Sequence, residues 1–332
     1  MTRLIDLSVV TRHTPSEATP VTVELLDHRT GATVLGLTPE DFPDGMAISN
    51  ETVTLTTHTG THMDAPLHYG PLSGGEPARS IDQVPLEWCF GPGVRLDVRR
   101  VPPGEGITVD QLRAALREAG RDAPHPGDIV LLWTGADGLW GSADYLAKYP
   151  GLTGEGTAFL VESGVRVIGI DAWGLDRPMP AMIEDYRATG DRGVLWPAHV
   201  YGRTREYLQL EKLAGLGALP AATGFTVVCF PVAVHGAGAG WTRVVALLDA
   251  EHAGQDGQDG QDGHAGHAEH AEHAGQDGHD ERDERDEHAE HAEHDEHDEH
   301  AEHAGHAGHA GQDGSGGAAG NGENDGDFRA PG

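Results

Sequence analysis

Residues 58–68 read His58-Thr-Gly-Thr-His62-Met-Asp64-Ala-Pro-Leu-His68. This stretch brings together imidazoles and a carboxylate, the ligand types that Zn and Mn take from proteins. In an extended chain alternate side chains share one face, so we expect His58, His62 and Asp64 to point the same way. The glycine at position 60 would leave room for an ion between the imidazoles. The proline at position 66 would then turn the chain and return His68 toward the same pocket.

Two other interpretations of this stretch are less favoured. His58 and His62 are four residues apart, as in a metalloprotease helix, but the Thr and Gly neighbours disfavour a helix and the general-base Glu of that motif is missing. A lone histidine in a sheet is more often a hydrogen-bonded structural residue than a ligand. Several metal-capable groups at this spacing favour a site instead. Isolated histidines, expected to be structural or exposed, are His13, His28, His125 and His235.

The residues around the motif alternate between strand and helix patterns, which indicates a mixed α/β domain. A capping box at Thr108-Val-Asp-Gln111 predicts a helix that ends near residue 120, and a second helix is predicted over 155–163. Apolar and β-branched runs predict strands over 4–10, 51–58, 94–98, 128–134, 165–170, 225–234 and 242–248. The glycine-rich stretch 236–240 is expected to form a turn or bulge. The pattern gives no strand order.

Charge and composition divide the chain at about residue 250. It carries 54 Asp and Glu against 22 Lys and Arg, a net charge of −32, and 14 of its 22 histidines follow residue 250. An acidic chain disfavours nucleic-acid binding, and no apolar run is long enough to span a membrane. The charged start, with Asp6 in its short apolar run, does not resemble a signal peptide, so we expect a cytoplasmic protein. Cys89 and Cys229 lie in apolar runs and are expected to be buried core residues.

Residues 251–332 form a low-complexity segment rich in His, Asp, Glu and Gly, and they are predicted to be a disordered tail beside a domain of residues 1–250. Histidine recurs every third residue from His288 to His309, a period that gives neither a helix face nor a strand face. A metal-storage role for this tract is the alternative hypothesis. Because the candidate ligands precede the tail, we expect its removal to leave folding and activity intact.

Residues 58–68 resemble the HxGTHxDxPxH signature of the metal-dependent cyclase family. That family includes bacterial kynurenine formamidases (arylformamidases), isatin hydrolases and cyclases of aromatic polyketide pathways. The resemblance extends over most of residues 1–250, including Ile5-Asp-Leu-Ser8, Gly127–Gly135, Val167–Asp171 and Gly236–Arg243. It implies an α/β swivelling domain, with a mixed, barrel-like sheet and flanking helices, that forms a homodimer or homotetramer.

The resemblance also implies a set of site residues. His58, His62 and Asp64 would hold a first divalent ion, Zn or Mn, and Asp64 could bridge to a second. His199 and Glu211 match the remaining ligands of the family, and His68 matches its catalytic histidine. Judged on residue pattern alone, His199 would be an ordinary loop residue and Glu211 an exposed helix carboxylate.

Two reactions are compatible with these residues. The stretch 190–199 and the Trp241-Thr-Arg243 ending look closest to the polyketide subgroup, which favours ring closure of a poly-β-ketone by intramolecular aldol condensation and dehydration. The alternative is hydrolysis of an amide on an aromatic ring, as in the formamidases and isatin hydrolases. Residues 178–195 look like an insertion relative to the formamidases. Candidates to line a pocket for an aromatic or polyketide substrate are Trp88, Trp173, Trp196 and Phe225.

Overall fold

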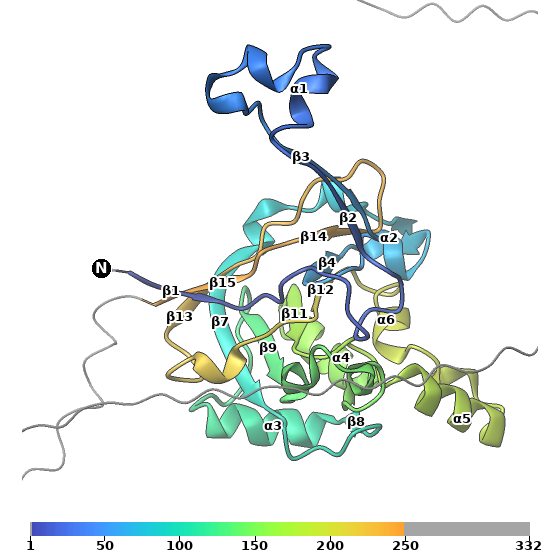
Figure 1. Ribbon diagram of the computed structural model, residues 1–332. Coiled ribbons are helices and arrows are strands. Elements are labelled where there is room, and N and C mark those ends of the chain that lie inside the picture. Colours follow the sequence, from blue (N-terminus) through green and yellow to red (C-terminus); the bar gives the residue numbers. More distant parts are fainter. Residues whose placement is uncertain (1, 249–332) are drawn as a thin grey trace, which may run out of the picture. The chain divides into compact units, whose positions relative to one another are not determined.

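The computed structural model describes residues 2–248, and the tail expected over residues 251–332 lies outside the described residues. A nine-stranded mixed sheet forms the centre of the domain and curls into a half-barrel (Figure 1). Its four middle strands run parallel to one another, and the other neighbouring strands pair antiparallel. In spatial order the strands are β1 (Arg3–Asp6), β15 (Val245–Leu248), β13 (Phe225–Val228), β7 (Phe90–Asp97), β9 (Ile129–Trp133), β11 (Val167–Ile170), β12 (Leu208–Glu211), β4 (His62–Asp64) and β14 (Ala239–Trp241).

Helices flank this sheet, which confirms the expected α/β class. The main ones are α3 (Val109–Glu118), α4 (Gly154–Glu162), α5 (Met179–Thr189) and α6 (Pro197–Tyr201). The capping box that predicts α3 is present, since the Thr108 hydroxyl accepts from the Gln111 amide and the Gln111 side chain accepts from the Thr108 amide. Two further sheets have two short strands each. One joins β5 (Leu72–Ser73) and β6 (Glu76–Pro77), and the other joins β8 (Gly106–Ile107) and β10 (Gly151–Leu152).

Both faces of the central strands are buried, as the unbroken apolar run in β9 predicts. Val130 and Leu132 pack on one side with residues of α3 and α4. Ile129 and Leu131 pack on the other side with residues of β4 and β12. Cys89 and Cys229 are free and buried, as expected. Among residues 2–248, no helix combines the length and apolar character needed to cross a bilayer.

Several predicted strands differ from the observed ones. Instead of a strand over 51–58, β3 (Asn50–Thr54) pairs with β2 (Thr22–Leu26) in a separate two-stranded sheet, and residues 57–58 form a turn. The strand expected over 4–10 ends at Asp6, and those over 225–234 and 242–248 shorten to β13 and β15. The glycine-rich stretch 236–240 begins in the expected turn, but its last two residues and Trp241 form β14, at the edge of the sheet beside β4.

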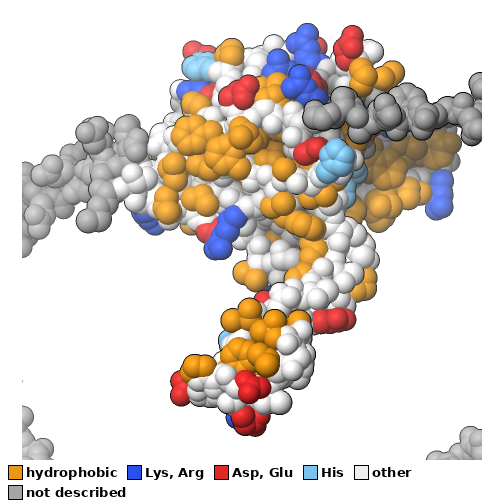
Figure 2. Space-filling view, turned by 90° about the horizontal axis from the view of Figure 1, so that it is seen from above, with side chains coloured by type: hydrophobic (Ala, Val, Ile, Leu, Met, Phe, Trp, Pro, Cys, Tyr) orange, Lys and Arg blue, Asp and Glu red, His pale blue; other side chains and the backbone are white. Residues whose placement is uncertain are grey.

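Residues 21–55, here named the arm, have little core of their own. They contain β2, the short helix α1 (Gly31–Val34), two 3-10 turns and β3. Figure 2 shows hydrophobic side chains gathered on the arm's surface. The exposed ones are Val23, Leu25, Val34, Leu35, Leu37, Met46, Ile48 and Val53.

Candidate metal centre

The pairing of β12 with β4 places a carboxylate opposite a histidine. In this antiparallel register Glu211 faces His62 and Gln209 faces Asp64. Met63 and Leu210, which alternate with these residues, are buried in the core on the other face. The strand period therefore aims His62, Asp64 and Glu211 at the same side of the sheet. Glu211 is a buried strand residue, so its interpretation as an exposed helix carboxylate is wrong.

His58 reaches the same place by a different route from the one expected. It lies in a turn rather than on a strand that continues into β4, so the prediction of one extended segment is wrong. Gly60 has a φ of +63°, and a Cβ there would lie 2.7 Å from the Thr11 hydroxyl. Its role is to allow a tight turn against residue 11, rather than to leave a gap between imidazoles. The turn still brings His58 Nδ1 within 2.9 Å of Asp64 Oδ1.

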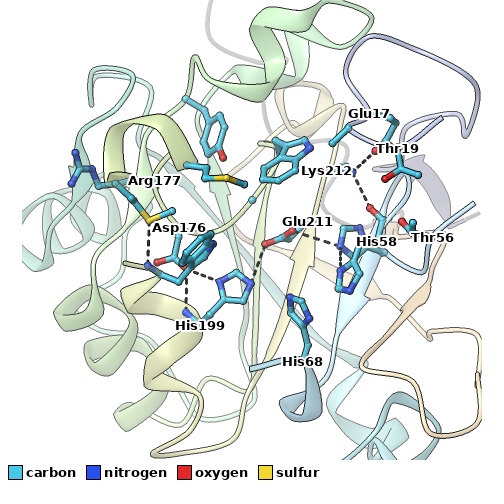
Figure 3. Close-up of a pocket in the computed structure, with 18 residues that line it drawn as sticks. Glu17, Thr19, Thr56, His58, His68, Asp176, Arg177, His199, Glu211 and Lys212 are labelled. Atoms are coloured by element: carbon cyan, nitrogen blue, oxygen red, sulfur yellow. Dashed lines mark hydrogen bonds and ion pairs between the residues drawn. The ribbon is translucent and has the colours of Figure 1, made fainter. Parts of the chain in front are cut away.

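His68 lies on α2 (Pro66–Tyr69), a single helical turn that begins at the proline expected to redirect the chain. Its ring centroid is 4.3 Å from that of His58 and 5.3 Å from that of His199. The chain therefore returns His68 toward the other histidines, as Figure 3 shows.

His199 lies on α6, close to Asp64 and Glu211. Its Nε2 is 3.9 Å from Asp64 Oδ2 and 3.9 Å from Glu211 Oε1. Its Nδ1 lies 2.5 Å from Asp176, whose carboxylate also accepts from the backbone amides of residues 198 and 199. A carboxylate on Nδ1 fixes the ring orientation and leaves Nε2 for a ligand, as at many metal sites. The interpretation of His199 as an ordinary loop residue is therefore wrong.

The buried Asp64 carboxylate indicates that the donor set suits a cation. Both of its oxygens are buried, and none of the described residues gives either of them a hydrogen bond of regular geometry, although an isolated buried charge is unfavourable. Oδ1 faces His58 and His62, at 2.9 and 3.4 Å, and Oδ2 faces His199. Donor atoms of His62, Asp64 and Glu211 all lie within 4.8 Å of one another, as do those of His58, Asp64 and His68. These oxygens and nitrogens fit one or two divalent ions.

Burial and neighbouring charges also shift the pKa values of the cluster strongly. Burial and the charge of Asp64 raise the pKa of Glu211 to about 7, and burial lowers that of His62 to about 3. Burial alone would lower the pKa of His199, but its hydrogen bond to Asp176 and nearby carboxylates raise it to about 9. Such perturbed groups in a cleft are typical of functional sites.

The pKa of His68 is lowered to about 4, chiefly by desolvation. More than a third of its residue surface stays accessible, but the ring lies among His58, Tyr69 and His199. This shift leaves the imidazole neutral and able to accept a proton at neutral pH.

A cavity of about 360 Å³ opens onto these residues, at the carboxyl ends of β11 and β12. Trp173 and Trp196 line it, as expected, whereas Trp88 and Phe225 do not. Trp88 packs near Arg79 and Arg166 and Phe225 belongs to the core, so both were wrongly expected in the pocket. Met179 and Met182 of α5, within the stretch interpreted as an insertion, form part of the wall. The aromatic and apolar part of this wall, which lies beside the charged groups of the metal centre, suits an aromatic ligand.

Three pocket residues were not identified from the sequence. Asp176 orients His199, and Glu17 and Lys212 form a buried ion pair with 2.6 Å between Nζ and Oε2. Lys212 directly follows the candidate ligand Glu211, and Asp176 lies three residues after the candidate pocket residue Trp173. Glu17, in contrast, comes from a distant loop. A local pattern gives no signal for a partner 195 residues away.

A family model described as "Putative cyclase" matches residues 5–177, just over half of the chain. Among solved structures, isatin hydrolase A from Ralstonia solanacearum is 25% identical, with a TM-score of 0.59 over 75% of this chain and 92% of that one. An isatin hydrolase bound to the product analogue thioisatinate is 21% identical, with a TM-score of 0.59 over 74% and 92%. A "potential metal-dependent hydrolase with cyclase activity" is 19% identical, with a TM-score of 0.52 over 75% and 99%.

Proposed function

Because the chain belongs to the cyclase family, we propose that this site is a divalent-metal centre that acts on a carbonyl group of a small aromatic molecule. The ligands in this proposal are His58, His62, Asp64, His199 and Glu211, with Zn or Mn as the ion. The observation that carries it is the buried Asp64 carboxylate, whose two oxygens face the ring nitrogens of histidines on both sides.

We propose hydrolysis of an amide or lactam on an aromatic ring as the reaction. A divalent ion would supply Lewis acidity to the carbonyl and activate water. His68, neutral at pH 7, takes the proton that water loses as its oxygen adds to the carbonyl carbon. His68 then returns that proton to the nitrogen as the carbon–nitrogen bond breaks, which leaves an amine and a carboxylic acid that loses its remaining proton to solvent. Trp173 and Trp196 hold the ring and keep bulk water out. The solved isatin hydrolases support this choice.

Aldol ring closure is the second candidate, supported by the likeness of residues 190–199 to the polyketide subgroup. There His68 would take a proton from the carbon between two carbonyls, and that carbon would form a bond to a third carbonyl carbon. Loss of water would follow. The main task of the pocket would be to fold the chain so that the correct carbons meet.

The deciding experiment offers three substrates to the purified full chain, loaded with Zn or Mn: isatin, N-formylkynurenine, and an aromatic ring that carries a 1,3-diketone chain and, next to it, a third carbonyl group. We expect hydrolysis of isatin or N-formylkynurenine, followed by absorbance. If neither is hydrolysed and the diketone loses one water with formation of a new ring, the reaction is ring closure and the hydrolase proposal fails.

Variants test the site separately from the choice of reaction. Asp64→Asn should lower kcat/KM by at least ~100-fold, because even residues that only hydrogen-bond a metal ligand change activity or metal affinity by about 10- to 100-fold. His68→Ala should keep the metal but lose about 10²- to 10⁴-fold in rate, as for a general base. His235→Ala, a fully exposed histidine outside the site, should behave as wild type. Wild-type activity in Asp64→Asn would contradict the metal centre.

A further inference from the structure

The chain has two lysines, and they lie in opposite environments. Among 22 Lys and Arg residues only Lys148 and Lys212 are lysines. The Lys148 side chain is 60% exposed, whereas that of Lys212 is 4% exposed and lines the cavity. A buried ammonium needs compensating partners, so its position next to the candidate ligand Glu211 calls for an explanation.

The backbone at Lys212 is held in an unfavourable conformation. Its φ is +57°, in the left-handed region that residues with a Cβ avoid. Along a regular strand, Lys212 would point away from the face of Glu211. The left-handed residue ends β12 instead, and both side chains line the same cavity. Such strain persists only where surrounding contacts enforce it, and it concentrates at functional sites.

Lys212 donates its backbone amide to the Ala172 carbonyl at 2.9 Å and holds its Nζ 5.8 Å from the centre of the Trp173 ring, and its other contacts lead to the turn that carries His58. Its Nζ donates to the His58 carbonyl at 2.8 Å and to Glu17 Oε2 at 2.6 Å. The other carboxylate oxygen of Glu17 accepts from the Gly60 amide at 2.7 Å. The Thr61 hydroxyl donates to the Lys212 carbonyl at 2.6 Å. Residues 58–61 are thus attached to the end of β12 at several points, and Figure 3 shows Lys212 between Glu17 and His58.

We propose that Lys212 and Glu17 are positioning residues that clasp the His58 turn against the end of β12 and thereby set the affinity of the metal centre. This inference rests on the proposed metal site. His58, unlike His62 and Asp64, has no sheet to fix it, and its side chain is 36% exposed. Holding a ligand in place before the ion arrives removes an ordering cost from binding.

The paired charges explain why a lysine is tolerated beside a cation site. A lone ammonium there would repel a divalent ion, but the Glu17 carboxylate neutralises it at 2.6 Å. A compact ammonium also directs three hydrogens at separate acceptors, whereas the planar guanidinium of arginine suits paired acceptors. This geometry accounts for a lysine at position 212 in a chain that otherwise uses arginine almost throughout.

The first test measures metal affinity in the full chain by titration with Co²⁺ and visible absorption. The Asp64→Asn variant, which lacks the proposed site, gives the background absorption of Co²⁺ bound elsewhere, including Co²⁺ bound by the histidine-rich segment 251–332. We expect Lys212→Met and Glu17→Gln to weaken binding at the site by about 10- to 100-fold, the range for groups that orient ligands. Lys148→Met, the exposed lysine, is the matched control and should bind as wild type.

The second test separates positioning from simple stabilisation. Each single variant leaves one buried group without its partner and should lower the melting temperature. The double variant Glu17→Gln/Lys212→Met removes both charges, so its melting temperature should recover relative to the singles while Co²⁺ affinity stays low. Reductive methylation gives an independent readout: Lys148 should label readily, and Lys212 should label only when Glu17 is replaced.

The outcomes are distinct. If affinity recovers together with melting temperature in the double variant, the pair is only structural and the proposal fails. It also fails if Lys212→Met binds Co²⁺ like Lys148→Met. If Asp64→Asn itself leaves the Co²⁺ signal unchanged, the metal centre of the proposed function is wrong, whatever the lysine variants show.

Discussion

The imidazole of His68 illustrates how position on the fold sets the chemistry of one residue. In the unfolded chain its pKa is near 6.5, whereas desolvation in the pocket lowers it to about 4. Between these two pH values only the unfolded chain holds the proton, so acidification through this window favours unfolding. Above pH 6.5 the residue is neutral in both states and this effect disappears.

We therefore expect the metal-free wild type to lose stability relative to His68→Gln as the pH falls from 6.5 to 4. Urea unfolding of chelator-treated protein at several pH values measures the difference, and the many other histidines cancel in the comparison. Parallel stability curves for the two proteins would show that the ring titrates normally in the fold.

At the scale of elements, the turn between β3 and β4 decides where His58 lies. Gly60→Ala would place a Cβ at a φ of +63° and 2.7 Å from the Thr11 hydroxyl. We expect a loss of roughly 1–2 kcal/mol in the free energy of unfolding from the left-handed conformation alone, and weaker Co²⁺ binding because the turn must shift.

Gly36→Ala provides the control for that prediction. Its φ is +70°, close to that of Gly60, but a Cβ there meets nothing within 4 Å. Gly36→Ala should lose a similar amount of unfolding free energy through its left-handed backbone, and it should bind Co²⁺ like the wild type. Equal metal affinity in the two variants would mean that the turn does not control the site.

The elements that the sequence predicts well are those with local signals. The capping box at Thr108 specifies where α3 begins, and the apolar run 129–133 specifies a strand with both faces buried. The Thr- and Val-rich stretch before His58 also contains a strand, but its residues do not reveal that its partner is β2. The family resemblance was needed to nominate His199 and Glu211, because their proximity to Asp64 depends on register and helix docking between distant segments.

At the scale of the whole molecule, the arm lacks the packing that stabilises a hairpin. Of its large apolar side chains, Val34, Leu35 and Ile48 are 69%, 63% and 77% exposed. An isolated two-stranded sheet is only marginally stable in water, and clustered exposed apolar residues mark interaction surfaces. We therefore expect a second copy of the chain to cover the arm, in agreement with the homodimer or homotetramer implied by the family resemblance.

Light scattering after size exclusion tests this expectation. The wild type should elute as a dimer or larger assembly, and Val34→Asp/Ile48→Asp should shift it toward monomer. Leu86→Asp, which alters an equally exposed leucine (61%) outside the arm, is the control. A monomeric wild type at all concentrations would exclude the second copy as the arm's cover.

The pairing of His62 with Glu211 also constrains how this chain can change over generations. Side chains alternate along a strand, so deletion of one codon within β4 or β12 would bring Met63 or Leu210 to the face that holds the metal ligands. The ligand side chains would then point into the apolar interior. Lineages can lengthen or shorten the connecting loops freely, whereas these two short strands must keep their residue count while the chemistry is retained.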